Sequence, residues 1–213
     1  MIHAMYAARV THLAAFTGIV LAGGRSTRMG RDKASIELRG RTLLARAVDT
    51  IRRAGGTPIV VSPPRPDLDR LGVRLLDDEG EGPLQALRMG LAAAAGPAFA
   101  LACDLPLLPP ELVTHLVDGL GDAPALVPRV QGKLQVLAAA YGAAALGAFD
   151  AALAAGETSV QGAVATLAAR AIVVELETLG AFGDERMFLN VNTPDDLRRA
   201  AELLPAGDPG RAA

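Results

Sequence analysis

The residues best suited to chemistry lie in one short segment, which runs from residue 21 to residue 33. Its sequence is Leu-Ala-Gly-Gly-Arg-Ser-Thr-Arg-Met-Gly-Arg-Asp-Lys, and it directly follows an apolar stretch of strand length. Gly23 and Gly24 carry no side chains, so backbone N–H groups can approach a phosphate closely there. Arg28 can neutralise phosphate charge as a bidentate fork, and Lys33 can do so as a point charge. The segment therefore predicts a binding loop for a small polyanion such as a triphosphate.

Two familiar phosphate-binding patterns are absent from this segment. The Gly-Lys-Ser/Thr ending of a Walker A loop is missing, and so is the Gly-x-Gly-x-x-Gly pattern of a dinucleotide-binding turn. A tight turn with solvated basic residues is the plainer alternative. The arginine, glycine and lysine residues that follow the paired glycines favour phosphate binding over such a turn.

A second candidate is Asp104, which follows the apolar run from residue 98 to residue 103. A carboxylate at the end of a buried central strand is held rigidly. Mg²⁺ is usually bound by one or two carboxylates together with substrate phosphates and water. Asp104 lies too far upstream to cap the helix expected behind Pro109 and Pro110. It is therefore a candidate metal ligand.

The elements that must position these residues alternate between strand-length apolar runs and helical patterns. This alternation predicts an α/β fold that is doubly wound, with a mostly parallel sheet and helices on both faces. Ligands of such sheets bind beyond the carboxyl ends of the strands. We expect strands over 18–21, 58–61, 73–76, 98–103, 126–127, 135–141, 172–176 and 189–191, helices over 43–54, 84–95, 111–120 and 143–155, and helix caps at 158–161 and 193–196.

Length, composition and charge fit a globular enzyme rather than a nucleic-acid or membrane protein. The 213 residues carry a formal net charge of −2, whereas nucleic-acid-binding proteins usually have a basic excess. No apolar run reaches the roughly 20 residues of a membrane span, and the lone Cys103 cannot form an internal disulfide. We expect a cytoplasmic monomer with a single domain over residues 17–204, an amino-terminal extension over 1–16 and a flexible tail over 205–213.

The loop from residue 21 to residue 33 resembles the signature loop of the sugar-phosphate and cofactor nucleotidyltransferases. The resemblance is closest to the molybdenum cofactor guanylyltransferases of the MobA type. Three later segments resemble the same family: Gly82-Pro83-Leu84 its helix-opening element near the base, residues 102–106 its Cys-Asp-x-Pro metal motif, and residues 190–195 its Asn-x-Asn-Thr-Pro-Glu/Asp element. These blocks occur in the expected order and cover nearly the whole chain.

The resemblance implies a Rossmann-like nucleotidyltransferase fold, a Mg²⁺ cofactor and specific residue roles. Lys33, Arg28 and Asp104 would be catalytic, and Asp104 would hold the metal with Asn192 as a weaker ligand. Acceptor binding would fall to Lys133, Gln135, Asn190 and Asn192. Nucleotide binding would involve Leu21, Ala22, Gly23, Gly24, Arg28, Lys33, Ser62, Asp78, Gly82, Pro83, Leu84 and Asp104.

Two positions depart from the family pattern. Ser62 falls where relatives often carry Asn, which puts a base contact by this residue in doubt. Residues 157–161 have the sequence Glu-Thr-Ser-Val-Gln, where many relatives carry Arg. Lys133 could supply the missing charge, and a solvated hairpin lysine fits the sequence equally well.

The reaction implied is transfer of GMP from GTP to the terminal phosphate of molybdopterin, with release of pyrophosphate. The Leu-Ala-Gly-Gly sequence goes with guanylyltransferases, whereas cytidylyltransferase relatives tend toward Leu-Ala-Ala-Gly. The alternatives are a CTP-dependent molybdopterin cytidylyltransferase, a transferase for another phosphorylated acceptor, and a catalytically silent nucleotide-binding partner in cofactor delivery. The expected partners are GTP, the molybdenum cofactor and, transiently, cofactor-delivery proteins, with no nucleic acid and no membrane.

Overall fold

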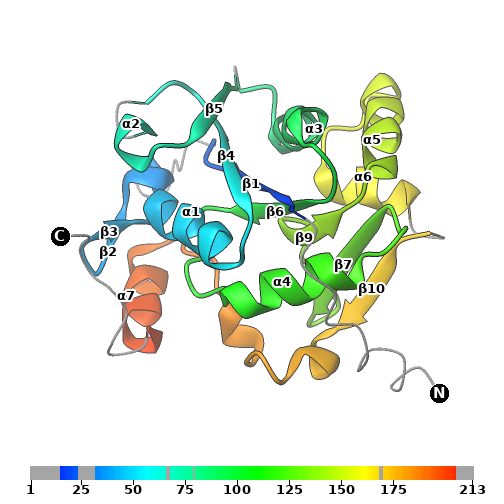
Figure 1. The fold of residues 1–213 in the computed structure, drawn as a ribbon. Coiled ribbons are helices and arrows are strands. Elements are labelled where there is room, and N and C mark those ends of the chain that lie inside the picture. Colours follow the sequence, from blue (N-terminus) through cyan, green and yellow to red (C-terminus); the bar gives the residue numbers. More distant parts are fainter. Residues whose placement is uncertain (1–14, 24–31, 66–67, 79, 168–169, 205–213) are drawn as a thin grey trace.

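The computed structural model describes residues 15–23, 32–65, 68–78, 80–167 and 170–204. These residues form a central sheet with helices packed on both of its faces (Figure 1). Its strands lie side by side in the order β10-β7-β9-β6-β1-β4-β5, and β8 pairs with β7. The strands are β1 (Thr17–Leu21), β4 (Thr57–Ser62), β5 (Arg74–Asp77), β6 (Ala98–Ala102), β7 (Ala125–Val130), β8 (Lys133–Leu134), β9 (Ala138–Tyr141) and β10 (Ile172–Glu175).

Most neighbouring strands of this sheet are parallel. Strand β1 runs parallel to both β4 and β6, β4 runs parallel to β5, and β10 runs parallel to β7. Only β8 and β9 oppose their neighbours within the described part of the chain. The predicted α/β fold with a mostly parallel sheet is thus confirmed.

The two faces of the sheet follow from the alternation of side chains along each strand. In β1, Val20 packs in the cluster that contains α1 (Leu43–Arg53) and α4 (Pro110–Gly119). Its neighbours Ile19 and Leu21 point to the other face, which is covered by α3 (Pro83–Ala93), α5 (Ala144–Ala154) and α6 (Val160–Thr166). Because both faces are covered, the central strands are apolar at successive positions.

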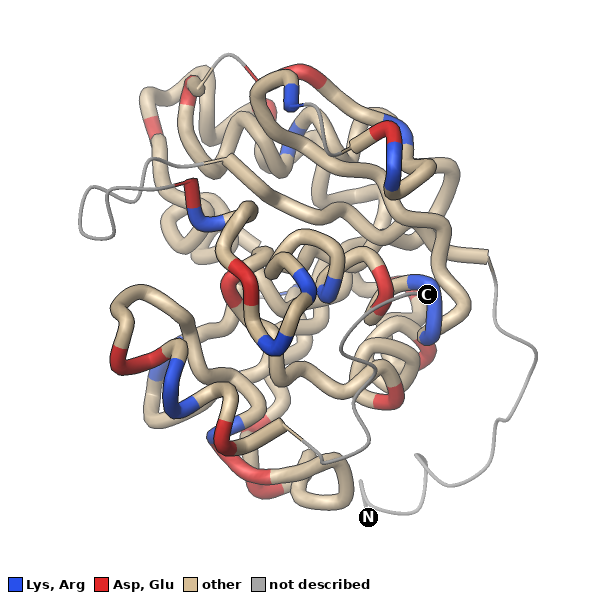
Figure 2. The backbone as a smooth tube through the Cα atoms, turned by 90° about the vertical axis from the view of Figure 1, so that its left-hand side faces the viewer, with Lys and Arg blue, Asp and Glu red and all other residues tan. Residues whose placement is uncertain are grey.

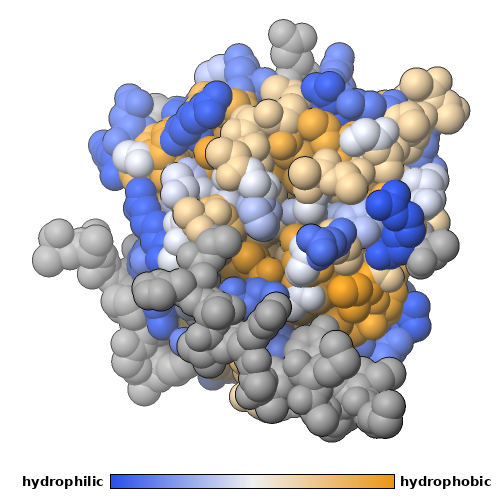
Figure 3. Space-filling view, turned by 45° about the vertical axis from the view of Figure 1, so that its right-hand side comes forward, coloured by the Kyte–Doolittle hydropathy of each residue, from blue (hydrophilic) through white to orange (hydrophobic). Residues whose placement is uncertain are grey.

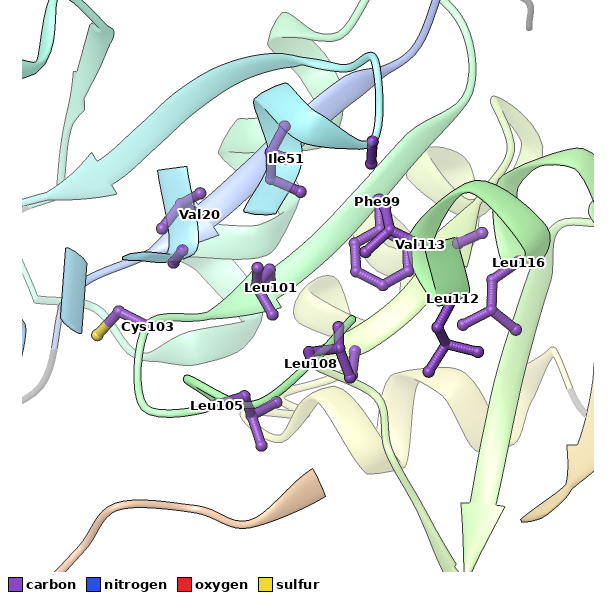
Figure 4. Packing of buried hydrophobic residues seen from close by; sticks show 14 of the residues in the cluster. Val20, Ile51, Phe99, Leu101, Cys103, Leu105, Leu108, Leu112, Val113 and Leu116 are labelled. Atoms are coloured by element: carbon purple, nitrogen blue, oxygen red, sulfur yellow. The ribbon is translucent and has the colours of Figure 1, made fainter. Parts of the chain in front are cut away.

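The packing of α4 illustrates how one face is closed. Leu112, Val113 and Leu116 of this helix lie against Phe99 of β6 (Figure 4), and each of these side chains is fully buried. Burial of such side chains contributes roughly 1.5–3 kcal/mol each. This packing fixes β6, and therefore the residues that follow it, within the sheet.

A smaller layer of structure lies beyond the sheet. It contains the hairpin of β2 (Glu37–Leu38) and β3 (Arg41–Thr42), and α7 (Pro194–Leu203) packs against it. The sequence analysis did not predict this hairpin, which is only two residues long on each side. The remaining short elements are η1 (Lys33–Ser35), α2 (Leu68–Leu71), η2 (Leu176–Leu179) and η3 (Glu185–Phe188).

Three local predictions were wrong. Residues 189–191 form no strand, since the described residues give them no ladder partner. The strand expected over 135–141 begins only at Ala138, because the N–H of Ala138 donates to the carbonyl of Gln135 at 2.9 Å and closes a turn. The helix cap placed at Thr158 is formed by Ser159, whose side chain accepts a hydrogen bond from the N–H of Gly162.

Phe16 is the last residue of the predicted amino-terminal extension. Phe16 is only 2% exposed and belongs to the core around α1. Its carbonyl accepts a hydrogen bond from the N–H of Thr57 at 2.9 Å. Phe16 therefore packs with the core of the sheet.

Charged residues of both signs are interspersed along the chain (Figure 2). On the face shown in Figure 3, hydrophilic residues separate smaller apolar patches. Val173 is the only large hydrophobic side chain that is exposed among the described residues. Within the same residues, every helix is too short or too polar to cross a membrane.

Candidate active site

A cavity of about 930 Å³ opens beyond the carboxyl ends of β1 and β6. Strand pairing creates this location, since Leu21 of β1 lies opposite Ala102 of β6. The N–H of Cys103 continues the ladder and donates to the carbonyl of Leu21 at 3.1 Å. The predicted residues that line the cavity are Leu21, Ala22, Gly23, Lys33, Asp78, Gly82, Pro83, Asp104, Gln135 and Asn190.

The centre of the site is a contact among three predicted residues. The ammonium group of Lys33 donates to Oδ2 of Asp104 at 2.8 Å and to Oδ1 of Asn192 at 2.5 Å. The side chains of Lys33 and Asp104 are 22% and 17% exposed, so this ion pair is only partly screened by solvent. Asp104 and Asn192, which lie 71 and 159 positions after Lys33 in the sequence, thus share its ammonium group.

Lys33 is positioned from its own side of the site by the short helix η1. Asp32 caps this helix, because its carboxylate accepts hydrogen bonds from the N–H of Ala34 and the hydroxyl of Ser35, both at 3.1 Å. Arg65 forms a salt bridge of 2.7 Å with the same carboxylate. The backbone of Lys33 is therefore fixed, while its long aliphatic stem leaves the ammonium group free to reorient.

Asn192 is positioned by the helix cap that follows it. Thr193 caps α7 in a capping box with Asp196, and Pro194 occupies the first helical position as predicted. Burial raises the pKa of Asp196, but hydrogen bonds from the Thr193 hydroxyl and from the N–H groups of Asn192 and Thr193 outweigh it and lower this pKa. The N–H of Val191 also donates to the carbonyl of Asp104 at 2.9 Å, which joins this segment to β6.

The donor set of this cluster suits a hard divalent cation. Oδ1 of Asp104 is buried and has no hydrogen-bond partner among the described residues. The other two oxygens, Oδ2 of Asp104 and Oδ1 of Asn192, already converge on a positive charge. The described parts of the chain contain no group of three or more His, Cys, Asp or Glu side chains that could hold a metal ion. An ion held here would need further oxygen ligands from a substrate and water, which is the usual situation for Mg²⁺.

Asp78 also lines the cavity and is only 5% exposed. Its N–H donates to the carbonyl of Ser62 at 3.1 Å, and its Oδ1 accepts from the N–H of Gly80 at 3.0 Å. Oδ2 faces Gly23, where a Cβ atom would lie only 2.9 Å away. Gly23 therefore permits a close approach between the first loop and this carboxylate.

The start of α3 forms the neighbouring part of the wall. Gly82 caps this helix with φ of 103°, a conformation that favours glycine, and Pro83 occupies the first helical position. Both residues line the cavity. The free N–H groups at the start of a helix favour negative charge or polar acceptors in such a place.

Several predicted residues do not line the cavity. Ser62 is fully buried and its hydroxyl donates to the carbonyl of Pro63 at 2.8 Å, so this side chain is turned toward its own chain. Leu84 belongs to the core under α3. Lys133 is exposed on β8, and Asn192 does not line the cavity but accepts a hydrogen bond from Lys33, which does. Gly24 and Arg28 lie outside the described residues.

The cavity also contains residues that the sequence analysis did not select. Gln161 of α6 lines it, although the sequence predicted only a helix cap and a missing arginine for this segment. Val136 lines it as well, because the turn before β9 carries this residue toward the site. The thiol of Cys103 is buried, and burial together with the charge of Asp104 raises its pKa to about 12. This thiol is therefore protonated near neutral pH and is no nucleophile.

Comparisons with known proteins agree with this geometry. Residues 18–173 match the family model described as MobA-like NTP transferase domain. A probable molybdenum cofactor guanylyltransferase from Pelotomaculum thermopropionicum is 33% identical over 92% of this chain and 96% of that protein. The molybdenum cofactor guanylyltransferase of Rhodobacter capsulatus is 34% identical over 90% of this chain and 98% of that protein.

The fold has a solved counterpart as well. The crystal structure of molybdopterin-guanine dinucleotide biosynthesis protein A from Archaeoglobus fulgidus superposes with a TM-score of 0.74. It covers 88% of this chain and 97% of that protein at 24% sequence identity. At this identity the likeness bears on the fold alone.

Proposed function

The chain belongs to the family of MobA-like NTP transferase domains, and we propose that it transfers GMP from GTP to the terminal phosphate of molybdopterin. The observation that carries this proposal is the meeting of Lys33, Asp104 and Asn192 at the cavity. The relatives from P. thermopropionicum and R. capsulatus, which match nearly the whole chain, carry the corresponding guanylyltransferase names.

The proposed step is an in-line displacement at the α-phosphorus of GTP. A bond forms between an oxygen of the molybdopterin phosphate and the α-phosphorus. The bond from the α-phosphorus to the oxygen bridging the α- and β-phosphates breaks, and the electron pair leaves with pyrophosphate. The attacking phosphate oxygen is already anionic near neutral pH, so no protein group has to remove a proton. This agrees with a site whose buried thiol is protonated.

The residues of the chain would act by positioning and by charge stabilisation. The ammonium group of Lys33 would move from Asp104 to the triphosphate and stabilise the charge that develops on the leaving pyrophosphate. Asp104 and Asn192 would hold Mg²⁺ through their side-chain oxygens. The ion would supply Lewis acidity and neutralise phosphate charge.

Different residues of the cavity would contact the two substrates. Gly23, Asp78 and Gly82 would contact the nucleotide, with the carboxylate of Asp78 and the first turn of α3 lining the cavity. Gln135, Gln161 and Asn190 also line the cavity and would contact the acceptor through their amide groups. We propose that these neutral amides bind the phosphate of the acceptor in this chain.

The test is Mg²⁺-dependent pyrophosphate release with molybdopterin, with GTP and CTP supplied in parallel. We expect release with GTP. Release with CTP alone would retain the mechanism and overturn the choice of nucleotide. Nucleotide binding without any pyrophosphate release would refute the proposed reaction and favour a silent binding protein.

Variants test the assigned roles in the same assay. Removal of one preorganised electrostatic group typically costs about 10²–10³ in rate, so we expect losses of at least about that size for Asp104→Ala and Lys33→Ala. Asp150→Ala is the matched control, because Asp150 is an exposed carboxylate that pairs with Arg88 on the helical surface. Near-normal turnover in either site variant would contradict the assigned roles.

A further inference from the structure

The ammonium group of Lys33 occupies the place where a cation bound by Asp104 and Asn192 would lie. It is within 2.8 Å of the Asp104 carboxylate and within 2.5 Å of the Asn192 amide oxygen. These oxygens come from the end of β6 and from the segment before α7, which the hydrogen bond from Val191 to Asp104 holds together. The position is thus built by the fold and is already filled by a positive charge.

We propose that the ammonium group of Lys33 prevents a divalent metal ion from binding to Asp104 and Asn192 until a nucleoside triphosphate binds. The proposal deepens the function proposed above and rests on it. A metal ion bound through Oδ2 of Asp104 and Oδ1 of Asn192 would coincide with the ammonium group. A metal ion bound through Oδ1 of Asp104 alone would face the same positive charge across one carboxylate, and at so short a distance in a partly buried site like charges repel strongly.

The nucleotide would remove this exclusion in two ways. Its phosphate oxygens would offer the ammonium group a partner with greater negative charge, and they would add ligands that Asp104 and Asn192 cannot supply alone. Lys33 can make this change without backbone movement, because Asp32 and Arg65 fix the start of η1 while the side chain remains partly exposed to the cavity. Metal binding would therefore depend on prior or simultaneous nucleotide binding.

The arrangement has a second consequence for the free protein. The carboxylate of Asp104 is mostly buried, and a buried charge is costly unless it is paired. Lys33 supplies that pairing before any substrate binds. The same residue thus stabilises the free site and would later contact the triphosphate.

The experiment measures Mn²⁺ binding to the full chain without nucleotide, by the loss of the electron paramagnetic resonance signal of free Mn²⁺. Lys33→Met keeps most of the length of the side chain and removes the charge. We expect this variant to bind Mn²⁺ at least about tenfold more tightly than the wild type, since repulsion by one adjacent charge exceeds the free energy of a tenfold change. Its melting temperature should also rise more than that of the wild type when Mn²⁺ is added.

The chain contains a matched control, because Lys33 and Lys133 are its only lysines. Lys133→Met changes the net charge equally at an exposed position outside the cavity, and its Mn²⁺ affinity should equal that of the wild type. The combination of Lys33→Met with Asp104→Asn should lose the gain in affinity.

Three results would overturn the proposal: equal Mn²⁺ affinity of Lys33→Met and wild type, no Mn²⁺ binding by either protein, or a gain that survives Asp104→Asn. The proposed reaction is tested separately by pyrophosphate release from the wild type. A wild type that releases no pyrophosphate would refute the reaction, while the Mn²⁺ titration would still decide whether Lys33 excludes metal from Asp104.

Discussion

The contact between Gly23 and Asp78 leads to a sharp prediction for Gly23→Ala. Gly23 does not have a positive φ angle, so alanine is compatible with the backbone at this position. The added Cβ atom would nevertheless lie 2.9 Å from Oδ2 of Asp78. Any effect of the substitution should therefore arise from this contact, which connects the first loop to the wall of the nucleotide region.

The magnitude follows from the hydrogen bonds that restrain the carboxylate. An ordinary van der Waals contact of a Cβ atom begins at a separation of 3.4 Å, so Oδ2 of Asp78 must move away by roughly 0.5 Å. The retreat is opposed by the hydrogen bond from the N–H of Gly80 to Oδ1, which is 3.0 Å long. Loss of one such bond costs about 1 kcal/mol, and 1.4 kcal/mol corresponds to a tenfold change in affinity. If Asp78 contacts GTP, Gly23→Ala should lower kcat/KM for GTP by about five- to tenfold.

The assay is initial-rate pyrophosphate release over a range of GTP and CTP concentrations. We expect the loss to be larger for GTP than for CTP, because the alanine reproduces the Leu-Ala-Ala-Gly sequence associated with cytidylyltransferases. Gly147→Ala is the matched control, since Gly147 lies in α5 and a Cβ atom added there would point into open space, with no neighbouring residue within 4 Å. Its activity should be unchanged, and its stability should rise by about 0.5–1 kcal/mol.

An unchanged kcat/KM for GTP in Gly23→Ala would refute this reasoning. It would mean that the Asp78 carboxylate yields without cost or that it does not contact the nucleotide. Asp78→Asn separates these explanations, because it removes the charge of the carboxylate and retains its shape. If Asp78→Asn also leaves GTP turnover unchanged, Asp78 has no role in nucleotide binding.

Three further predictions concern stability. Thr193→Ala removes a capping hydrogen bond of α7 and should lower the free energy of unfolding by about 1 kcal/mol. The melting temperature should then fall by about 2–4 °C, and an unchanged melting curve would contradict the stabilising role of this cap. Gly90→Ala places a Cβ atom 2.4 Å from Cγ2 of Ile19. This overpacking should lower the free energy of unfolding, measured with denaturant, by about 1–3 kcal/mol. A higher free energy of unfolding would show that α3 can move away from β1 without loss of stability. Burial, with the charge of Asp104, raises the pKa of Cys103 from 9.0 to about 12, so the unfolded chain loses this proton first and stability should fall as the pH rises from 9 toward 12. Cys103→Ala should flatten that fall, and an identical pH profile in the variant would exclude the thiol as its cause.

The sequence by itself determined the class of fold and the composition of the active-site edge. Apolar runs of strand length, helical spacing and the proline and threonine at the start of α7 act over a few neighbouring residues, so their signals are local. Because ligands of parallel sheets bind at the carboxyl ends of strands, the loop after β1 and Asp104 are predicted to lie at the site. The structure places the described ends of that loop, at Gly23 and Lys33, and Asp104 beside one cavity.

The tertiary structure alone decided how these residues meet. The contact between Lys33 and Asn192 spans 159 positions, and the approach of Asp78 to Gly23 depends on the order of β1, β4 and β5 in the sheet. Neither contact has a local sequence pattern, because the relative placement of strands is fixed by packing on both faces of the sheet.

The predictions that were wrong or incomplete also failed because packing between distant segments decides the outcome. Residues 189–191 have the apolar composition of a strand, but they pair with no strand among the described residues, and the N–H of Val191 donates to the carbonyl of Asp104 instead. Gln161 reaches the cavity from α6, whose residues Val160, Ala163 and Val164 pack in the core. No local sequence pattern shows which side of the helix this packing turns toward the site. Composition therefore determined which residues could do chemistry, whereas the packing of the sheet and its helices determined which of them face the site.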